Sequence, residues 1–469
     1  MPPAIATVVY AFGIMGLFVF DRDRESRTSK ALWIPVVWLL IAGSRMVSQW
    51  LEMATPTDSP EQYLDGSPLD RIILAALLAA GVIVLLNRRR EVGALLRANG
   101  PILLFFFYCA TSIFWSDYPD VAFKRWIKAL GDLVMVLIVL TDLDPSAAVK
   151  RFLTRASFLL VPVSVLLIKY YSELGRGYNR WTWTVYYTGV ATEKNSLGYV
   201  CLVFGLASLW IFLRLFRDAE GTRRVGPLIV HGTLLVMVLW LFWKADSMTS
   251  LSCFLMAGGM IVVTSPDVLA RKPAVVHLYV VAVLSISLFA LVLDPGSGFL
   301  QALGRDPTLT GRTAIWSQVL RLTANPWVGT GFESFWLGQR LDTIWRNNWW
   351  HPNEAHNGYL EVYLNLGWIG VTLLAVVLAT GYRNAVRAFR QNPDVGRLSL
   401  AYFVAAAAYS LTEAGFRMLN PVWITLLLAT MARPQPAVAG VPDVSQQERP
   451  GQQSAEQLGD RTEIYEEVV

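Results

Sequence analysis

The stretch YLEVYLNLGWIGVTLLAVVLATGY, residues 359–382, decides the fold of this chain. It carries one charged side chain, Glu361, and it is as long as the roughly 20 apolar residues that a helix needs to cross a bilayer. Similar runs recur along the 469 residues, which are 54% hydrophobic and 16% charged, with a mean hydropathy of +0.43. Because backbone groups in lipid must be satisfied within each segment, the sequence predicts an all-α polytopic membrane protein.

The apolar runs predict about 12–13 transmembrane helices. The expected spans are 3–20, 31–51, 72–87, 101–116, 122–141, 152–170, 196–216, 228–244, 250–265, 275–294, 359–382, 398–412 and 420–432. The first run lacks a basic leader and a small-residue cleavage site, so we expect a retained span. Residues 1–435 form one membrane domain in this prediction, and the Pro-, Gln- and Glu-rich residues 436–469 a disordered cytoplasmic tail.

The connecting segments alternate in charge. Short basic loops are typical of the cytoplasmic side, and here they are 21–30, 88–97, 217–227, 266–274 and 383–397. The acidic segment 52–70 and the aromatic segments 171–195 and 295–358 then face outward. The longest of these, 295–358, is the expected extracytoplasmic catalytic loop, with short helices of its own.

Basic residues nevertheless gather at the outer ends of the spans. They are Lys124, Arg125, Arg176, Arg180, Lys194 and Arg417. Interfacial snorkelling or a salt bridge explains any one of them about as well as a function does. As a set they favour a recessed site for a lipid-linked phosphate or pyrophosphate, which arginine binds through two parallel hydrogen bonds.

Within the long loop, residues from Thr313 to Leu322 have the spacing of a short amphipathic helix, which Thr310 or Thr313 would cap. We expect this helix to lie on the membrane surface with its apolar stripe down. Arg312 would then sit near a helix N-terminus, which attracts anions. Asn325-Pro326 ends the helix, and Gly329-Thr330-Gly331 permits a tight turn.

Aromatic and histidine side chains complete the candidate site. Trp316, Trp336 and Trp350 are candidate glycan-binding residues, although tryptophan also populates membrane interfaces. His356 lies at the outer mouth of span 359–382, where it could act as a general base for a hydroxyl or donate a hydrogen bond to a leaving phosphate. His351 and His356 lack accompanying metal-ligand spacing, so we expect no metal and no cofactor.

The order of these motifs resembles the O-antigen ligase/polymerase superfamily (Wzy/WaaL type). The shared elements are Arg312, the Pro-x-x-Gly-x-Gly of 326–331, Ala355-His356-Asn357, and Gly367 after ten intervening residues. Lys194-Asn195 before a span also fits, and the segment 304–316, with Thr-Gly-Arg-Thr, resembles the ExoQ-type polymerase branch.

The resemblance implies a GT-C-type glycosyltransferase of the bacterial inner membrane, with its site facing the periplasm or exterior. It would transfer glycan from undecaprenyl pyrophosphate, polymerising repeat units into exopolysaccharide or O-antigen. In that reading Arg312 binds pyrophosphate and His356 is catalytic. The expected partners are the lipid-linked donor, the glycan acceptor, membrane lipid, and chain-length regulator and export proteins; no nucleic acid is expected.

Three alternatives stay open at this point. The first is a ligase that transfers finished polymer to lipid A core, and the second is a protein O-oligosaccharyltransferase. The third, from a different class, is a polysaccharide transporter or flippase, which should carry its charges at mid-membrane depth rather than at one face.

Overall fold

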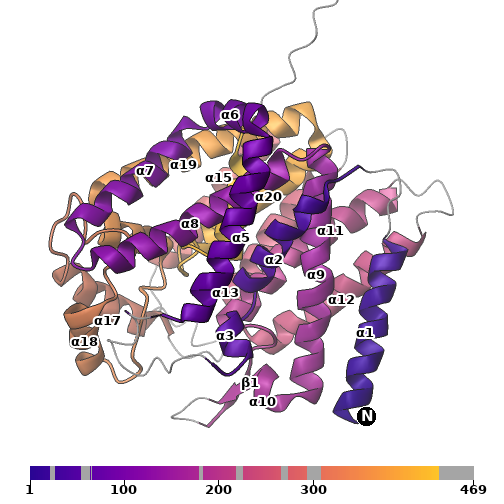
Figure 1. Ribbon diagram of the computed structural model, residues 1–469, viewed down its shortest axis with the longest axis horizontal. Helices are drawn as coiled ribbons and strands as arrows, with labels where there is room; N and C mark the ends of the chain where they lie inside the picture. The colour runs from indigo at the N-terminus through magenta and orange to yellow at the C-terminus, as the bar shows by residue number, and fades with distance from the viewer. Residues whose placement is uncertain are drawn as a thin grey trace, which may run out of the picture. The chain divides into compact units, whose positions relative to one another are not determined.

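The computed structural model describes residues 1–21, 27–53, 64, 66–178, 183–217, 225–265, 273–292 and 308–432. Apart from one two-stranded hairpin, the regular structure of this part is helical, which confirms the all-α prediction. Residues Met1–Ala432 form one compact unit (Figure 1). The predicted tail, 436–469, lies outside the described residues and stays a prediction.

Each predicted span coincides with helix. The N-terminal half contains α1 (Pro3–Phe20), η1 (Lys30–Leu32), α2 (Trp33–Ala42), α3 (Val47–Trp50), α5 (Pro68–Asn87), α6 (Arg89–Ala98), α7 (Gly100–Thr111), η2 (Ser112–Trp115), α8 (Pro119–Leu140), α9 (Pro145–Tyr170) and α10 (Ser172–Gly175). After the antiparallel strands β1 (Arg176–Tyr178) and β2 (Val185–Tyr187) come α11 (Lys194–Arg217), α12 (Val225–Ala245), α13 (Met248–Val263), α15 (Pro273–Val292), α17 (Thr308–Arg321), α18 (Gly338–Asn347), α19 (Gly358–Gln391), α20 (Pro393–Tyr409) and α21 (Pro421–Thr430).

Six helices of the described part are long and apolar enough to cross a membrane: α1, α5, α9, α11, α12 and α19. A seventh span results if α6 and α7, which are bent by 89° relative to each other, count as one. Shorter apolar helices include α2, α13, α15 and α21. The predicted 12–13 spans therefore all correspond to helical segments, but only about half of them are long and apolar enough to cross a membrane as single helices. The chain is therefore a multi-pass membrane protein.

Contacts between residues far apart in the chain bring several of the expected cytoplasmic segments together. Asp142 accepts from the Ser29 amide and pairs with Arg88, and so joins two of the expected cytoplasmic segments. Arg217 and Arg397 both donate to the Ser265 carbonyl and so join two more, 217–227 and 383–397, at the end of span 250–265. In Figure 1, α6 lies at the top of the view, whereas α10, β1, α17 and α18 lie toward the bottom.

Proline and short polar side chains set where the helices begin. Proline occupies the first turn of α5, α8, α9, α20 and α21, where its missing N–H costs nothing. Asp144, Asn357, Asn392 and Asn420 cap helices by accepting backbone N–H bonds. The caps on α19 and α21 matter most here, because the candidate site lies beside both.

The long outer loop has a core of its own. Ile315 and Val319 of α17 are buried with Phe335, Leu341 and Ile344. The amphipathic helix exists, but it begins at Thr308 rather than near Thr313, and its apolar face packs against α18 rather than lying on the membrane surface. The expectation was incomplete because the sequence pattern of α17 does not reveal that α18 covers it.

The glycines of the loop motif and of α19 meet at a break in that helix. Gly367 has φ +63° and ψ −165°, and the Trp368 and Ile369 amides bond the carbonyls of Pro326 and Trp327. The Thr330 and Gly331 amides bond the carbonyls of Leu364 and Asn365 on the other side of the break. The Pro-x-x-Gly-x-Gly segment therefore satisfies backbone groups that the interrupted helix leaves free.

A buried carboxylate ties the segment 413–420 to the bundle. Asp132 of α8 is inaccessible to solvent and accepts from the Trp38 indole at 2.8 Å and the Leu419 amide at 2.9 Å. Leu419 lies two residues after Arg417, so the contact fixes the part of the loop that carries this arginine.

We expect Gly367→Ala to be strongly destabilising. A Cβ there would lie 2.2 Å from the Trp327 carbonyl carbon, and the positive φ penalises any L side chain. The expected loss is about 2 kcal/mol or more, seen as a lower Tm of the detergent-solubilised protein.

Gly93→Ala is the matched control, because its Cβ would meet nothing closer than 3.8 Å in α6. That change should leave stability equal or raise it by up to about 1 kcal/mol. Equal Tm values for the two variants would contradict the role assigned to the break.

Candidate active site

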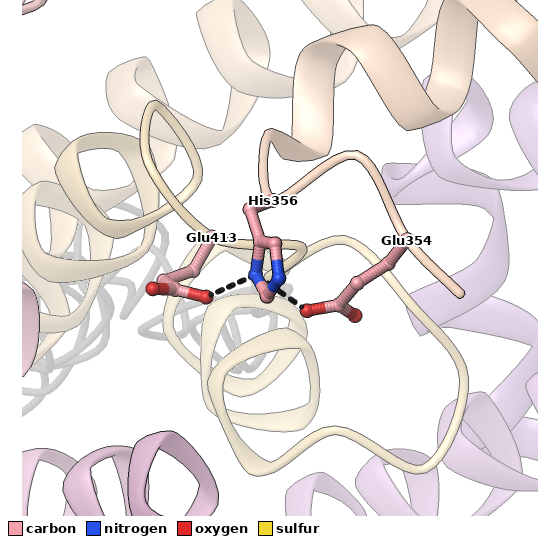
Figure 2. Close-up of side chains that lie close together, drawn as sticks. All are labelled: Glu354, His356 and Glu413. Atoms are coloured by element: carbon pink, nitrogen blue, oxygen red, sulfur yellow. Dashed lines mark hydrogen bonds and ion pairs between the residues drawn. The ribbon is translucent and has the colours of Figure 1, made fainter. Parts of the chain in front are cut away.

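His356 lies immediately before the capped start of α19, as the sequence predicts. Asn357 caps the helix by accepting from the Tyr359 and Leu360 amides, and its own amide donates to the Leu411 carbonyl. The His356 Nδ1 atom lies 2.9 Å from Glu354 Oε1 and 3.0 Å from Glu413 Oε2 (Figure 2). The ring is thus held between two carboxylates, one from the loop before α19 and one from the segment after α20.

These carboxylates decide the charge of the ring. Burial alone would lower the pKa of His356, but the hydrogen bonds and charges of Glu354 and Glu413 raise it to about 10. Burial likewise works against ionisation of Glu354, yet His356 and Arg417 lower its pKa to about 2. At neutral pH the site therefore holds an imidazolium beside ionised Glu354.

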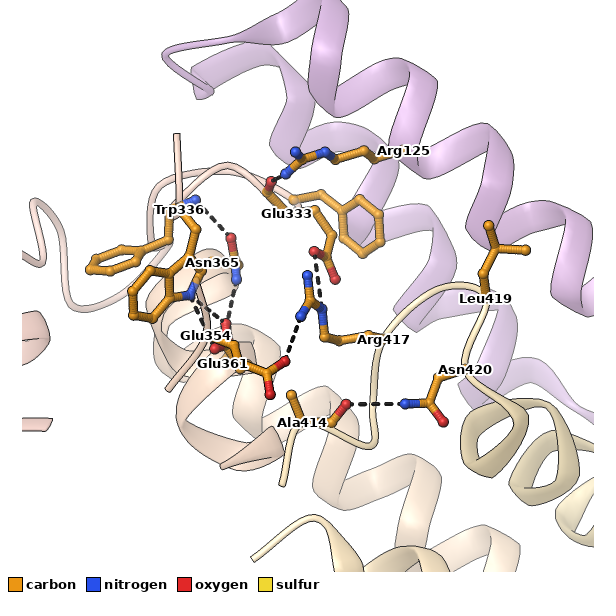
Figure 3. Close-up of polar contacts among 12 residues, drawn as sticks. Arg125, Glu333, Trp336, Glu354, Glu361, Asn365, Ala414, Arg417, Leu419 and Asn420 are labelled. Atoms are coloured by element: carbon orange, nitrogen blue, oxygen red, sulfur yellow. Dashed lines mark hydrogen bonds and ion pairs between the residues drawn. The ribbon is translucent and has the colours of Figure 1, made fainter. Parts of the chain in front are cut away.

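Arg417 extends this cluster toward α8. Its Nη1 atom lies 2.8 Å from Glu354 Oε2 and its Nε atom 3.7 Å from Glu333 Oε2 (Figure 3). Burial opposes its charge, but Glu333, Glu354 and Glu361 together raise the pKa of Arg417 above its usual value. Glu333 also accepts, through its backbone carbonyl, a hydrogen bond from Arg125 of α8.

A second layer of contacts fixes the segment that carries Glu354 and His356. Glu361 accepts from the Trp336 indole at 2.9 and 3.0 Å and from the Ala355 amide. The Ala355 carbonyl accepts from the Trp316 indole at 2.7 Å. Both backbone groups of Ala355 are therefore held, which limits the positions open to its two neighbours.

Two cavities meet at Arg417. The first, of about 320 Å³, has both basic and apolar walls: Lys124, Arg125, Lys128, Arg71, Leu74, Leu78 and Phe123 are among its lining residues. The second, of about 230 Å³, is polar and lined by Glu193, Asn195, Tyr199, Asn353, Glu354, Tyr409, Glu413 and Asn420, among others. Arg417 and Met418 line both. We call them the basic cavity and the polar cavity.

The structure gathers only part of the predicted cationic set. Lys124, Arg125 and Arg417 line the basic cavity. Arg176 instead donates to the Ile168 carbonyl and lies over the Tyr187 ring, which anchors the hairpin. Lys194 is exposed at the first residue of α11.

Two predicted arginines are not fully described. The backbone of Arg312 lies in α17, but its side chain is outside the described part, as is the whole of Arg180. The pyrophosphate role of each stays a prediction.

The three candidate glycan-binding tryptophans differ in exposure. Trp336 is 6% exposed and bonded to Glu361, and Trp316 is half-buried and bonded to Ala355, so both support the site from within. Trp350 is 39% exposed and keeps a surface that a glycan could contact. Trp327 and Trp349, at 66% and 64%, are more open still.

Sequence reasoning missed the carboxylates. Glu193, Glu333, Glu354 and Glu413 received no role. Acidic side chains beside the outer ends of spans were the available signal, because charges at such positions need partners.

The same carboxylates bear on the expectation of metal-free chemistry. The donor atoms of Glu354, His356 and Glu413 lie within 4.8 Å of one another, a spacing that a cation could use. Metal independence therefore stays a prediction of the sequence.

The fold and site together define a multi-pass membrane protein with a charged, recessed site at one end of the bundle. Residues 182–375 match the family model described as O-antigen ligase, Wzy_C. Over 291 residues the chain is 25% identical to the exopolysaccharide production protein ExoQ of Rhizobium meliloti (strain 1021). The match covers 60% of this chain and 64% of that relative, slightly under two thirds of its length. Both matches support the predicted resemblance to the O-antigen ligase/polymerase superfamily and its ExoQ-type branch.

The raised pKa of His356 gives a pH-dependent stability. A pKa raised from 6.5 to about 10 on folding means that the contribution is complete below about pH 6.5 and is lost as the pH rises through 10. We therefore expect the Tm of the wild-type protein to fall between pH 7 and pH 10.

His356→Gln is the comparison, because glutamine keeps a polar side chain but cannot carry the charge. Its Tm should lack this component of the alkaline decline. Parallel curves for wild type and variant across that range would argue against an imidazolium at the site.

Proposed function

We propose that the protein transfers glycan from a polyprenyl pyrophosphate carrier to a sugar hydroxyl and thereby polymerises oligosaccharide repeat units. The observation that carries the proposal is the cluster of His356, Glu354 and Arg417 between a basic cavity and a polar cavity. Such an arrangement suits a reaction in which an anionic leaving group and a neutral nucleophile approach from different sides. The ligase/polymerase family supplies the reaction class.

The basic cavity is the proposed donor site. Lys124, Arg125 and Arg417 offer cationic donors for two phosphates, and Leu74 and Leu78 of α5 offer an apolar wall for the first isoprene units. This combination of charge and apolar surface fits an amphiphilic phosphate better than a free sugar. We further propose that Arg312, which the sequence motif assigns to pyrophosphate, contributes to donor binding.

In this proposal His356 does not act as the general base. With a pKa of about 10 it is already protonated at neutral pH, so it cannot accept the hydroxyl proton without first losing its own. In the proposed mechanism the imidazolium and Arg417 stabilise the negative charge that develops on pyrophosphate as the sugar C1–O bond breaks. Of the two roles that the sequence suggests for His356, general base and hydrogen-bond donor to the leaving phosphate, the mechanism uses the second.

Polymerase is the preferred form because the matched relative is an exopolysaccharide production protein. The matched family model is described as an O-antigen ligase, so transfer of finished polymer to lipid A core is the second candidate. The two share a donor site and differ in acceptor. In either case the proposed location is the bacterial inner membrane, with the site facing outward.

We expect His356→Ala, Arg417→Lys and Arg312→Ala to lower polymer formation by about 100-fold or more, since each removes a preorganised charge or a bidentate contact. The assay uses reconstituted protein and lipid-linked oligosaccharides purified from native host cells that lack this protein. A ladder of products supports a polymerase, and one addition to a foreign acceptor supports a ligase.

Arg346→Ala is the control, because Arg346 is 78% exposed on α18 and pairs only with Asp342 among the described ion pairs. It should retain the wild-type rate. Normal ladders from His356→Ala and Arg417→Lys would sink the proposal, and loss of activity in EDTA with recovery on adding a divalent cation would show that the chemistry needs a metal.

A further inference from the structure

The polar cavity contains a carboxylate that the mechanism above does not use. Glu193 lies immediately before α11 and lines the cavity together with Asn195, Glu354 and Glu413. Among the described residues its side chain takes part in no hydrogen bond or ion pair. At about 230 Å³ the cavity is several times the roughly 30 Å³ of one water molecule, so it can admit part of a sugar.

The charges of the polar cavity select against phosphate. Three of its lining side chains are carboxylates, from Glu193, Glu354 and Glu413, and Arg417 is the one arginine or lysine among the lining residues described. Like charges would repel a pyrophosphate, whereas the remaining polar lining groups, from Asn353, Asn420 and the cavity tyrosines among others, are neutral amides and hydroxyls. The cavity therefore suits a neutral, hydroxyl-rich ligand.

The other carboxylates at the site already have partners. Both oxygens of Glu354 are occupied, one by His356 and the other by Arg417. Glu413 faces His356 with one oxygen and Asn195 with the other, at 3.3 Å. Neither can accept a proton without disrupting the ion pairs that hold His356.

Glu193 differs from these two in its environment. Glu193 keeps an exposed face. The surrounding protein still desolvates its carboxyl enough to raise the pKa, and the charges of Glu354 and Glu413 add to this, while His356 and Arg417 oppose it. This raised pKa makes Glu193 a stronger base than Glu354, whose pKa is about 2. Among the described carboxylates lining the cavity it alone combines access with basicity.

We propose that the polar cavity binds the acceptor sugar and that Glu193 is the general base that takes the proton of its attacking hydroxyl. This inference rests on the proposed function. The hydroxyl O–H bond breaks with its proton passing to a Glu193 oxygen, and the oxygen forms a new bond to C1 of the donor sugar. The C1–O bond to pyrophosphate breaks with its electron pair, so lipid pyrophosphate leaves toward Arg417 and Arg125.

The test compares Glu193→Gln, Glu193→Asp and wild type in the reconstituted assay with purified lipid-linked oligosaccharides. Glu193→Gln should lower the transfer rate by about 100-fold or more, as expected for a lost general base, while Tm and the Kd for undecaprenyl pyrophosphate stay at wild-type values. Glu193→Asp should restore part of the rate. Glu173→Gln, an equally conservative change at an exposed glutamate of α10, is the control and should behave as wild type.

The pH profile separates a base from a structural residue. In wild type the rate should fall as the pH drops through the raised pKa of Glu193, and the residual rate of Glu193→Gln should lack this acid limb. A wild-type rate in Glu193→Gln, an unchanged acid limb, or loss of rate together with Tm and undecaprenyl pyrophosphate binding would overturn the assignment. If the wild-type protein itself transfers no glycan, the proposed function fails as well, and that result appears without any variant.

Discussion

The contact between Arg417 and Glu354 is the interaction on which the site depends. It joins the outer loop before α19 to the turn between α20 and α21, and the same glutamate holds His356. Charges withdrawn from water in this way are costly unless each has a partner. The cluster meets this condition by alternating signs through Glu413, His356, Glu354, Arg417 and Glu333. Removing one member would leave a neighbouring charge uncompensated, so the cluster behaves as a unit.

The helical framework followed from sequence because its signals are local. Apolar runs identified the main helices, and the position of His356 directly before an apolar run placed the histidine at the mouth of α19. The role of Gly367 is visible only in three dimensions: Pro326 to Gly331 covers the backbone groups that Gly367 exposes. The Pro-x-x-Gly-x-Gly segment and Gly367 are far apart in the sequence, but in the structure they form one hydrogen-bonded unit.

The pairing of the carboxylates could not be read from sequence in the same way. His356 meets a glutamate 57 positions away, and Asn195 meets the same glutamate from 218 positions away. No periodicity links such positions, and a lone histidine at a span end gives no sign of its partners. Its charge state therefore stayed open, although both a base and a hydrogen-bond donor were chemically reasonable. The tryptophans show the same limit, since Trp336 supports Glu361 from within rather than facing a glycan.

The position of Arg417 suggests why two cavities share one arginine. In the proposed reaction negative charge builds on pyrophosphate in the basic cavity while a carboxylate in the polar cavity is neutralised by a proton. Charge thus shifts from the polar side of Arg417 to the basic side. Because the guanidinium faces both and is held by Glu354 and Glu333, it can follow this shift without moving and without solvent reorganisation. A lysine, with a single point charge, could satisfy one side but not both.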